Sequence, residues 1–221
     1  MKTSLIIPAY FANQRLINLT AECLHSLDAS QRPDEVILVD DGGIPDETDN
    51  YGAEFRHLLD NYIKLDTNSG YCKAVNAGLK EATGDVLIVG NNDITFLDGW
   101  LDAIMLPIQM GADISMIRVS DSDGWEIEQK MSEGDKFGSL FAMTRKTYDT
   151  LGGFDEHNFR GYFSDLDYRK RAQDAGLSIV KNHAAVVGHL GGKTYKTVRD
   201  KVDFIAGKQA YMRKWGVKTV E

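Results

Sequence analysis

The chain has 221 residues, 43% of them hydrophobic and 26% charged, which fits a soluble globular domain and excludes disordered and fibrous classes. Its formal net charge of −8 argues against broad nucleic-acid binding, which usually needs a basic face. The only cysteines, Cys23 and Cys72, form no CxxC pair, so we expect buried free thiols in a reduced, cytoplasmic setting. No apolar stretch approaches the about 20 residues needed to span a bilayer, so any contact with a membrane would be peripheral.

Strands and helices alternate in the first half of the chain. Short, branched apolar runs predict buried strands, at 5–7, 36–39, 62–65 and 86–89. Apolar residues at helical spacing predict helices over about 13–29 and 71–82. This alternation predicts right-handed βαβ units and therefore an α/β fold with a mostly parallel sheet.

The second half is less regular. We expect three strands, at 113–119, 137–143 and 179–187, and a surface loop at 120–136. A short helix should end at Leu151-Gly152-Gly153, and Gly176 should close a helix over 165–175. A final amphipathic helix is expected over 198–215, with an apolar stripe docked on the domain and its bases outward; the stripe consists of Val198, Val202, Ile205 and Met212.

Polar or special residues follow each strand predicted in the first half. They are Pro8-Ala9-Tyr10, Asp40-Asp41, Asn68-Ser69-Gly70 and Asn92-Asp93. Ligands of open α/β sheets bind at the carboxyl ends of the strands, so these four loops predict one binding edge.

Asp93 comes just after a buried strand, where a carboxylate is well placed to bind a divalent cation beside phosphate groups. Asn92 offers an amide oxygen or a hydrogen bond to a sugar. The alternative is that Asn91-Asn92-Asp93 forms only a turn, since Asn and Asp favour turns.

Three further sites each have a structural and a functional interpretation. Asp41 can accept the imide N–H of uracil or thymine, or it can belong to an Asp-Gly turn. Asp165 can act as a general base, or it can cap its helix or pair with Arg169. Asp165 and Asp167 face different ways, so only one of them can be the base. His189 is either a metal ligand or a hydrogen-bonded structural histidine.

The order of the motifs is more specific than any one of them. From the N-terminus they are Ile7-Pro8-Ala9-Tyr10, Val39-Asp40-Asp41-Gly42, Asn68-Ser69-Gly70 with Asn76-Ala77-Gly78, Asn91-Asn92-Asp93, Gly152-Gly153-Phe154-Asp155, Asp165-Leu166-Asp167 and His189. This succession resembles glycosyltransferase family 2 from Ser4 to about Trp215. The resemblance implies a single GT-A domain over 1–221, with a nucleotide-binding half at about 1–95 and an acceptor-binding half at about 96–221.

The resemblance also implies roles for individual residues. The donor nucleotide would lie against Pro8, Ala9, Tyr10, Asp41, Asn68 and Gly70, with Lys73 nearby. Asn92 and Asp93 stand in place of the DxD motif, with Asp93 as metal ligand and His189 beside metal or diphosphate. Asp165 matches the catalytic base, and the acceptor side comprises Gly153, Phe154, Asp155 and Asp167.

The implied activity is a metal-dependent, inverting glycosyltransferase that uses Mn²⁺ or Mg²⁺ and a UDP- or dTDP-sugar. Asn92 is neutral where many members have Asp, and Ser164 replaces a common acidic residue. These departures leave a catalytically silent carbohydrate-binding or scaffolding module as the alternative. A sugar-nucleotidyltransferase would need a Gly-rich, basic loop after the first strand, where this chain has Ala9-Tyr10-Phe11-Ala12-Asn13.

The acceptor is less defined. A surface polysaccharide or a lipid-linked glycan is the default, which suggests polysaccharide biosynthesis; a protein or a modified nucleic-acid base are the other classes. Bases outnumber acids from Lys193 to Lys218. We expect Lys193, after the Gly191-Gly192 hinge, to close over the donor diphosphate, and the final helix to face an anionic acceptor or a membrane surface. The alternative is a solvated basic helix face.

Overall fold

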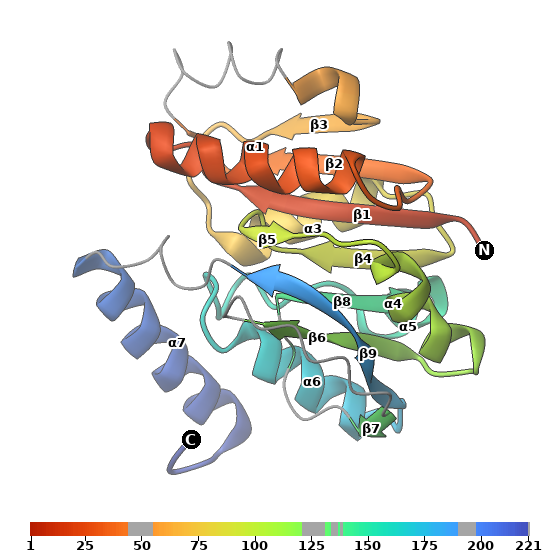
Figure 1. Ribbon diagram of the computed structural model, residues 1–221. Coiled ribbons are helices and arrows are strands. Elements are labelled where there is room, and N and C mark those ends of the chain that lie inside the picture. Colours follow the sequence, from red (N-terminus) through yellow and green to blue (C-terminus); the bar gives the residue numbers. More distant parts are fainter. Residues whose placement is uncertain (44–54, 121–130, 134–136, 138, 190–197, 221) are drawn as a thin grey trace.

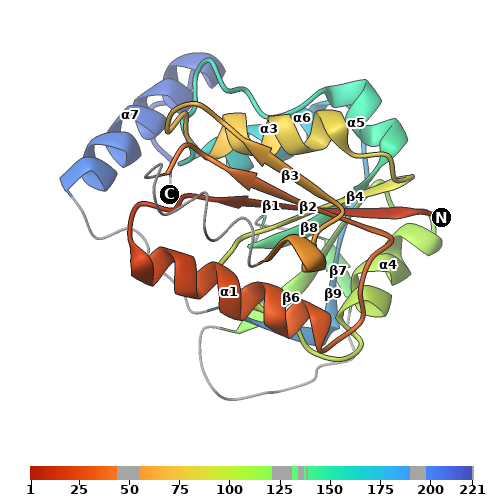
Figure 2. The ribbon, with the colours of Figure 1, turned by 90° about the horizontal axis from the view of Figure 1, so that it is seen from above.

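The structure is a computed structural model that describes residues 1–43, 55–120, 131–133, 137, 139–189 and 198–220. A central sheet separates two layers of helices (Figures 1 and 2). None of the helices in these ranges combines the length and the apolar composition of a transmembrane span.

The first half of the chain forms a parallel sheet. Its strands lie in the order β3-β2-β1-β4, with bounds β1 (Thr3–Ala9), β2 (Glu35–Asp40), β3 (Asn61–Lys64) and β4 (Val86–Gly90). Every residue of β1 and β4 is buried, which explains why both runs are almost wholly apolar. Two helices, α1 (Gln14–Asp28) and α3 (Tyr71–Glu81), cover opposite faces of this sheet (Figure 2).

The second half extends the same sheet. The antiparallel strand β8 (Leu140–Thr144) joins β4 to β6 (Ile114–Ser120), and β6 pairs in parallel with β9 (Ile179–His189). Two short strands, β5 (Ile94–Thr95) and β7 (Met131–Glu133), pair antiparallel with β9. Six strands therefore share one direction, namely β1, β2, β3, β4, β6 and β9, and the predicted mostly parallel α/β sheet is confirmed.

Two buried apolar clusters hold the layers together. One lies under α1 and α4 (Trp100–Gln109), and the other lies under α3 and α6 (Ser164–Asp174). The shorter helix α5 (Arg145–Leu151) lies on the α3 side, and a 3₁₀ turn, η1 (Arg56–Leu58), precedes β3. The last helix, α7 (Val198–Trp215), lies at the outer edge, on the side where β1 ends (Figures 1 and 2).

Four elements differ from the sequence expectation. No element is expected from the sequence for the segment that forms β5 and α4. Pro107 lies inside α4, where proline is normally disfavoured. The segment 120–136 was expected to be a loop, but Met131–Glu133 pairs with β9. The strand expected at 137–143 begins at Leu140 instead.

The docking of α7 also differs from the expectation. Val202 and Ile205, which were expected to face the domain, are 59% and 55% exposed. The helix instead packs through Gly207 and Ala210, which are buried. The expected direction of the stripe is wrong at Val202 and Ile205, because Phe204, Lys214 and Trp215 of α7 are the side chains that contact Phe163 and Asp167 of the domain.

Candidate active site

Asp41 ties together two loops at the carboxyl edge of the sheet. Its Oδ1 accepts the backbone N–H of Ser69 at 2.7 Å, and its Oδ2 accepts that of Gly70 at 2.8 Å. The Asn68 amide donates to Oδ2 at 3.2 Å. Burial raises the pKa of Asp41, although the two N–H groups and nearby Arg160 lower it. A carboxylate has about four acceptor positions, so one remains for a ligand N–H.

Gly70 is required by this geometry. Its φ of +98° lies in the region that side chains rarely adopt, and an added Cβ would lie 2.7 Å from the carbonyl oxygen of Arg160. The tight turn aims the Gly70 N–H at Asp41 and starts α3 immediately afterwards. The N-terminus of α3 therefore opens on the same edge as Asp41, where its partial positive charge suits a phosphate.

Arg160, which was not expected at the site from the sequence, contacts the same loop as Asp41. Its guanidinium donates to the carbonyl oxygen of Asn68 at 3.0 Å and to the Asn68 side-chain oxygen. Its Nε lies 3.7 Å from Asp203 of α7. Arg160 thus joins the Asn68–Gly70 loop to the last helix. Arg160 and Asn68 are 92 positions apart in the sequence, which gives no local signal for their contact.

The residue after Asp93 pairs with His189 in the sheet. Asp93 is 8% exposed and directly precedes β5, whose first residue, Ile94, pairs with His189. The backbone of His189 therefore lies beside the residue that follows Asp93. The neighbouring Asn92 donates its amide to Thr20 at 2.8 Å, which leaves its side-chain oxygen available to a ligand.

The described residues contain no group of three or more His, Cys, Asp or Glu side chains that could hold a metal ion. Mg²⁺ in phosphate sites takes one or two carboxylates and completes its shell with substrate oxygens and water. Asp93, with the backbone of His189 next to it, fits such an open site.

Asp165 lies at the first turn of α6, and an unusual turn precedes it. Within the described ranges, Phe163 is the one non-glycine residue with a positive φ, at 68°. Such backbone strain clusters at functional sites. Asp165 is half-buried, and burial raises its pKa even though N–H groups at the helix start and the charge of Arg169 lower it. A carboxylate with a raised pKa is a stronger base.

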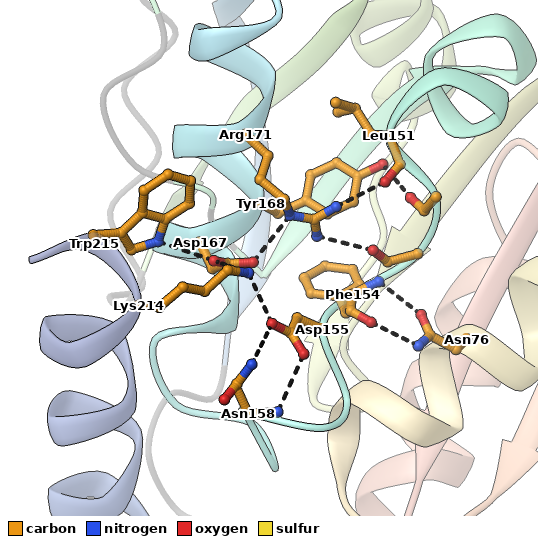
Figure 3. A network of polar contacts seen from close by, with 12 residues as sticks. Asn76, Leu151, Phe154, Asp155, Asn158, Asp167, Tyr168, Arg171, Lys214 and Trp215 are labelled. Atoms are coloured by element: carbon orange, nitrogen blue, oxygen red, sulfur yellow. Dashed lines mark hydrogen bonds and ion pairs between the residues drawn. The ribbon is translucent and has the colours of Figure 1, made fainter.

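Asp167, expected on the acceptor side, is not on an open surface of the described structure. Its side chain is 0% exposed. It lies 2.7 Å from Lys214 Nζ and accepts hydrogen bonds from Arg171 and Trp215, each at 3.0 Å (Figure 3). Lys214 and Trp215 join this carboxylate on α6 to α7, and Arg171 holds it from its own helix, so these contacts favour a structural role.

The Gly153-Phe154-Asp155 segment packs against α3 and α7. Asn76 binds Phe154 in both directions, because its amide donates to the Phe154 carbonyl at 2.9 Å and its oxygen accepts the Phe154 N–H at 2.8 Å (Figure 3). Burial raises the pKa of Asp155, but hydrogen bonds from Lys214 and Asn158 outweigh it and bring the pKa to about 2. Phe154 is buried, so only the exposed parts of this segment can meet an acceptor.

The remaining residues predicted to bind the donor nucleotide differ in their exposure to solvent. Pro8 and Ala9 are buried strand residues, and the Ala9 carbonyl accepts the N–H of Asp41 at 2.8 Å. Tyr10 is half-buried at the strand end, and Lys73 is exposed in the first turn of α3. Lys193 lies outside the described residues.

The model of Glycosyl transferase family 2 matches residues 4–169, three quarters of the chain, from β1 into α6. The chain belongs to glycosyl transferase family 2. Among curated relatives, an uncharacterized glycosyltransferase of Bacillus subtilis, YwdF, is 27% identical over 157 residues, which cover 71% of this chain and 53% of the relative. A dolichol-phosphate mannosyltransferase of Pyrococcus furiosus is 27% identical over 165 residues, covering 70% of this chain and 45% of the relative. This family member thus spans about half the length of these relatives.

Solved structures share the fold. Residues 1–349 of TarS from S. aureus, in complex with UDP-GlcNAc, match with a TM-score of 0.73 at 19% identity, covering 100% of this chain and 68% of that one. The mannosyltransferase PcManGT from Pyrobaculum calidifontis, in complex with GDP-Man and Mn²⁺, matches with a TM-score of 0.69 at 18% identity, covering 96% of this chain and 64% of that one. GalNAc-T7 with UDP, GalNAc and Mn²⁺ matches with a TM-score of 0.70 at 16% identity, covering 85% and 43%. The GT-A fold expected from the sequence is therefore confirmed.

Proposed function

We propose that this chain is the catalytic domain of a metal-dependent, inverting glycosyltransferase that uses a UDP- or dTDP-sugar. One observation carries the proposal: groups suited to a nucleobase, a diphosphate and proton removal all lie at the carboxyl edge of one sheet. They are Asp41, the N-terminus of α3, Asp93 beside the His189 backbone, and Asp165. The solved structures of the same fold with UDP, UDP-GlcNAc or GDP-Man add support.

Each group has a distinct task in this proposal. Asp41 holds the nucleobase through its remaining acceptor position, while Tyr10 lies at the strand end beside it. Gly70 and Asn68 shape the loop that leads the diphosphate to the start of α3, where Lys73 is exposed. Lys193, beyond the described residues, is proposed to approach the diphosphate from the other side.

A bound Mn²⁺ or Mg²⁺ supplies Lewis-acid neutralisation of the diphosphate leaving group. Asp93 would hold it, with His189 as the second protein ligand. Asp165 removes the proton from the acceptor hydroxyl as that oxygen attacks the anomeric carbon. The C1–O bond to the diphosphate breaks on the opposite face, which inverts the configuration. The acceptor we propose is a glycan, free or lipid-linked.

Thermal unfolding with UDP tests the donor and metal sites together. We expect UDP with Mn²⁺ to raise the melting temperature more than UDP or Mn²⁺ alone, since ligand at 100 times its Kd stabilises by about 2.7 kcal/mol. Asp93→Ala should lose this gain. Asp98→Ala, an exposed carboxylate five positions on, should keep it. Equal UDP stabilisation in Asp93→Ala would overturn the metal assignment.

Donor hydrolysis separates the enzyme from a catalytically silent module of the same fold. When water takes the place of the acceptor, an active enzyme of this kind hydrolyses the donor slowly and releases the nucleotide. The measurement is therefore the release of UDP from UDP-sugars in the presence of Mn²⁺. UDP-dependent stabilisation without any release, across a panel of UDP- and dTDP-sugars, would favour the binding module.

A further inference from the structure

The outward face of α7 is apolar at its centre. Val202 and Ile205 are 59% and 55% exposed, and Met212 is half-buried along the same side. The opposite side of the helix carries the buried Gly207 and Ala210. In soluble domains this arrangement is normally reversed, with the apolar stripe toward the core.

The inward face of α7 is too closely fitted for the helix to turn. An added Cβ at Gly207 would lie 2.5 Å from the carbonyl oxygen of Tyr162 and 3.3 Å from the Phe163 ring. Further along, Lys214 and Trp215 reach the buried Asp167. These contacts fix the rotation of the helix, so the aliphatic stripe is held toward solvent.

Bases flank the stripe. Lys201 and Arg213 are exposed, and Lys208 is half-buried. Among the residues that the structure describes, none forms an ion pair with these three bases, whereas Asp203 of the same helix pairs with Arg160. The chain as a whole carries a formal charge of −8, so this face is a local exception to its acidity.

We propose that this face, made of Lys201, Val202, Ile205, Lys208 and Arg213 and here called the α7 outer face, lies on an anionic lipid surface. Aliphatic side chains flanked by bases suit the boundary between acyl chains and anionic headgroups. The long Lys and Arg side chains can reach the headgroups while their stems stay apolar.

The position of the helix favours a bilayer over a folded protein partner. The α7 outer face belongs to a single helix at the rim of the molecule (Figures 1 and 2), a shape that meets a flat surface more readily than a groove. Phe204 is 46% exposed, and the centroid of its ring lies 5.4 Å from that of Tyr162 and 5.2 Å from that of Phe163. Those residues lead directly to Asp165, so one helix, α7, would separate the bilayer from the proposed base.

Vesicle co-sedimentation tests this proposal without any need for activity. We expect the protein to sediment with vesicles of equal parts phosphatidylcholine and phosphatidylglycerol, and to remain in solution with phosphatidylcholine alone. Binding should weaken as salt rises, because the headgroup attraction is screened. The double substitution Val202→Asp and Ile205→Asp should weaken binding at least tenfold.

Met110→Asp is the matched control. Met110 is 70% exposed and caps the end of α4, and α4 lies on the opposite side of the molecule from α7 (Figures 1 and 2). Its substitution should therefore leave sedimentation unchanged. Absence of wild-type sedimentation, or an equal loss in Met110→Asp, would overturn the proposal. Self-association abolished by the double substitution, without vesicle binding, would show that a second copy covers this face instead.

The proposed activity and the proposed membrane contact can be refuted independently of each other. Stabilisation by UDP with Mn²⁺ should be the same in the double variant as in the wild type, since both side chains point to solvent on the outer side of α7, away from the residues proposed to bind the donor. A protein that binds vesicles but not UDP would refute only the enzymatic proposal.

Discussion

Asp165 is the residue on which the proposed chemistry depends most directly. Asp165→Asn keeps the shape of the side chain but removes the proton acceptor, so turnover should fall by the roughly 10²–10⁴-fold associated with general-base catalysis. Stabilisation by UDP and Mn²⁺ should barely change. Because burial raises the pKa of Asp165, turnover should be lost on acidification at a pH above the ordinary aspartate range of about 3.9.

The matched control is Asp174→Asn at the other end of the same helix. Asp174 is exposed and pairs with Lys170, so it touches neither the sheet edge nor α7. A comparable loss of turnover in Asp174→Asn, or full turnover in Asp165→Asn, would mean that another group removes the proton.

At the scale of the element, Asp167 couples α6 to α7. Asp167→Asn removes the negative charge between Arg171 and Lys214 and weakens the bond to Trp215. Breaking a fully buried pair costs about 3–5 kcal/mol; we expect about 2–3 kcal/mol here, because the two bases keep some contact with water. Urea unfolding measures the loss.

Asp174→Asn again serves as the control, since an exposed i,i+4 pair contributes only about 0.3–0.5 kcal/mol. If Asp167→Asn retained wild-type stability and lost only turnover, Asp167 would belong to the reaction and not to the packing.

The elements of the first half of the chain, compared with α7, show where prediction from sequence succeeds. The strands β1, β2 and β4 and the helices α1 and α3 were predicted because burial on both sheet faces, or on one helix face, leaves a periodic apolar pattern. The orientation of α7 was not predictable in this way. Its inward face is chosen by Asp167, Phe163 and Arg160, which come from another part of the chain.

The candidate site divides along the same line. Asp93 and Asp165 follow a strand and start a helix, so their positions could be inferred from local pattern alone. Arg160 and the pairing of Ile94 with His189 depend on contacts between distant segments. Local sequence carries no record of such contacts, and only the arrangement of the sheet brings them together.

At the scale of the whole molecule, carboxylates with opposite shifts determine how stability depends on pH. Hydrogen bonds outweigh burial and lower the pKa of Glu35 and Asp155, and those from Thr3 lower that of Asp34. Their stabilising effect is present above the unfolded pKa, about 3.9 for aspartate and about 4.3 for glutamate. It is lost as the pH falls through the folded pKa, which for Asp155 is about 2.

The other group acts in the opposite sense. Burial raises the pKa of Asp40, Asp41 and Asp165, so their contribution is complete below the unfolded value and is lost as the pH rises through their folded values. The net charge of −8 at neutral pH adds self-repulsion that decreases toward the pI of about 5.1. We therefore expect the free energy of unfolding to rise from pH 7 toward mildly acidic pH and to fall below about pH 4.

Asp155→Asn isolates one part of this curve: it should destabilise the protein at pH 7 and make the fall between about pH 4 and pH 2 shallower, because the group that takes up the proton on unfolding is gone. Urea unfolding across this pH range is the measurement, with Asp174→Asn as control, and a variant curve parallel to the wild type below pH 4 would show that the ion pair with Lys214 does not hold the Asp155 pKa low.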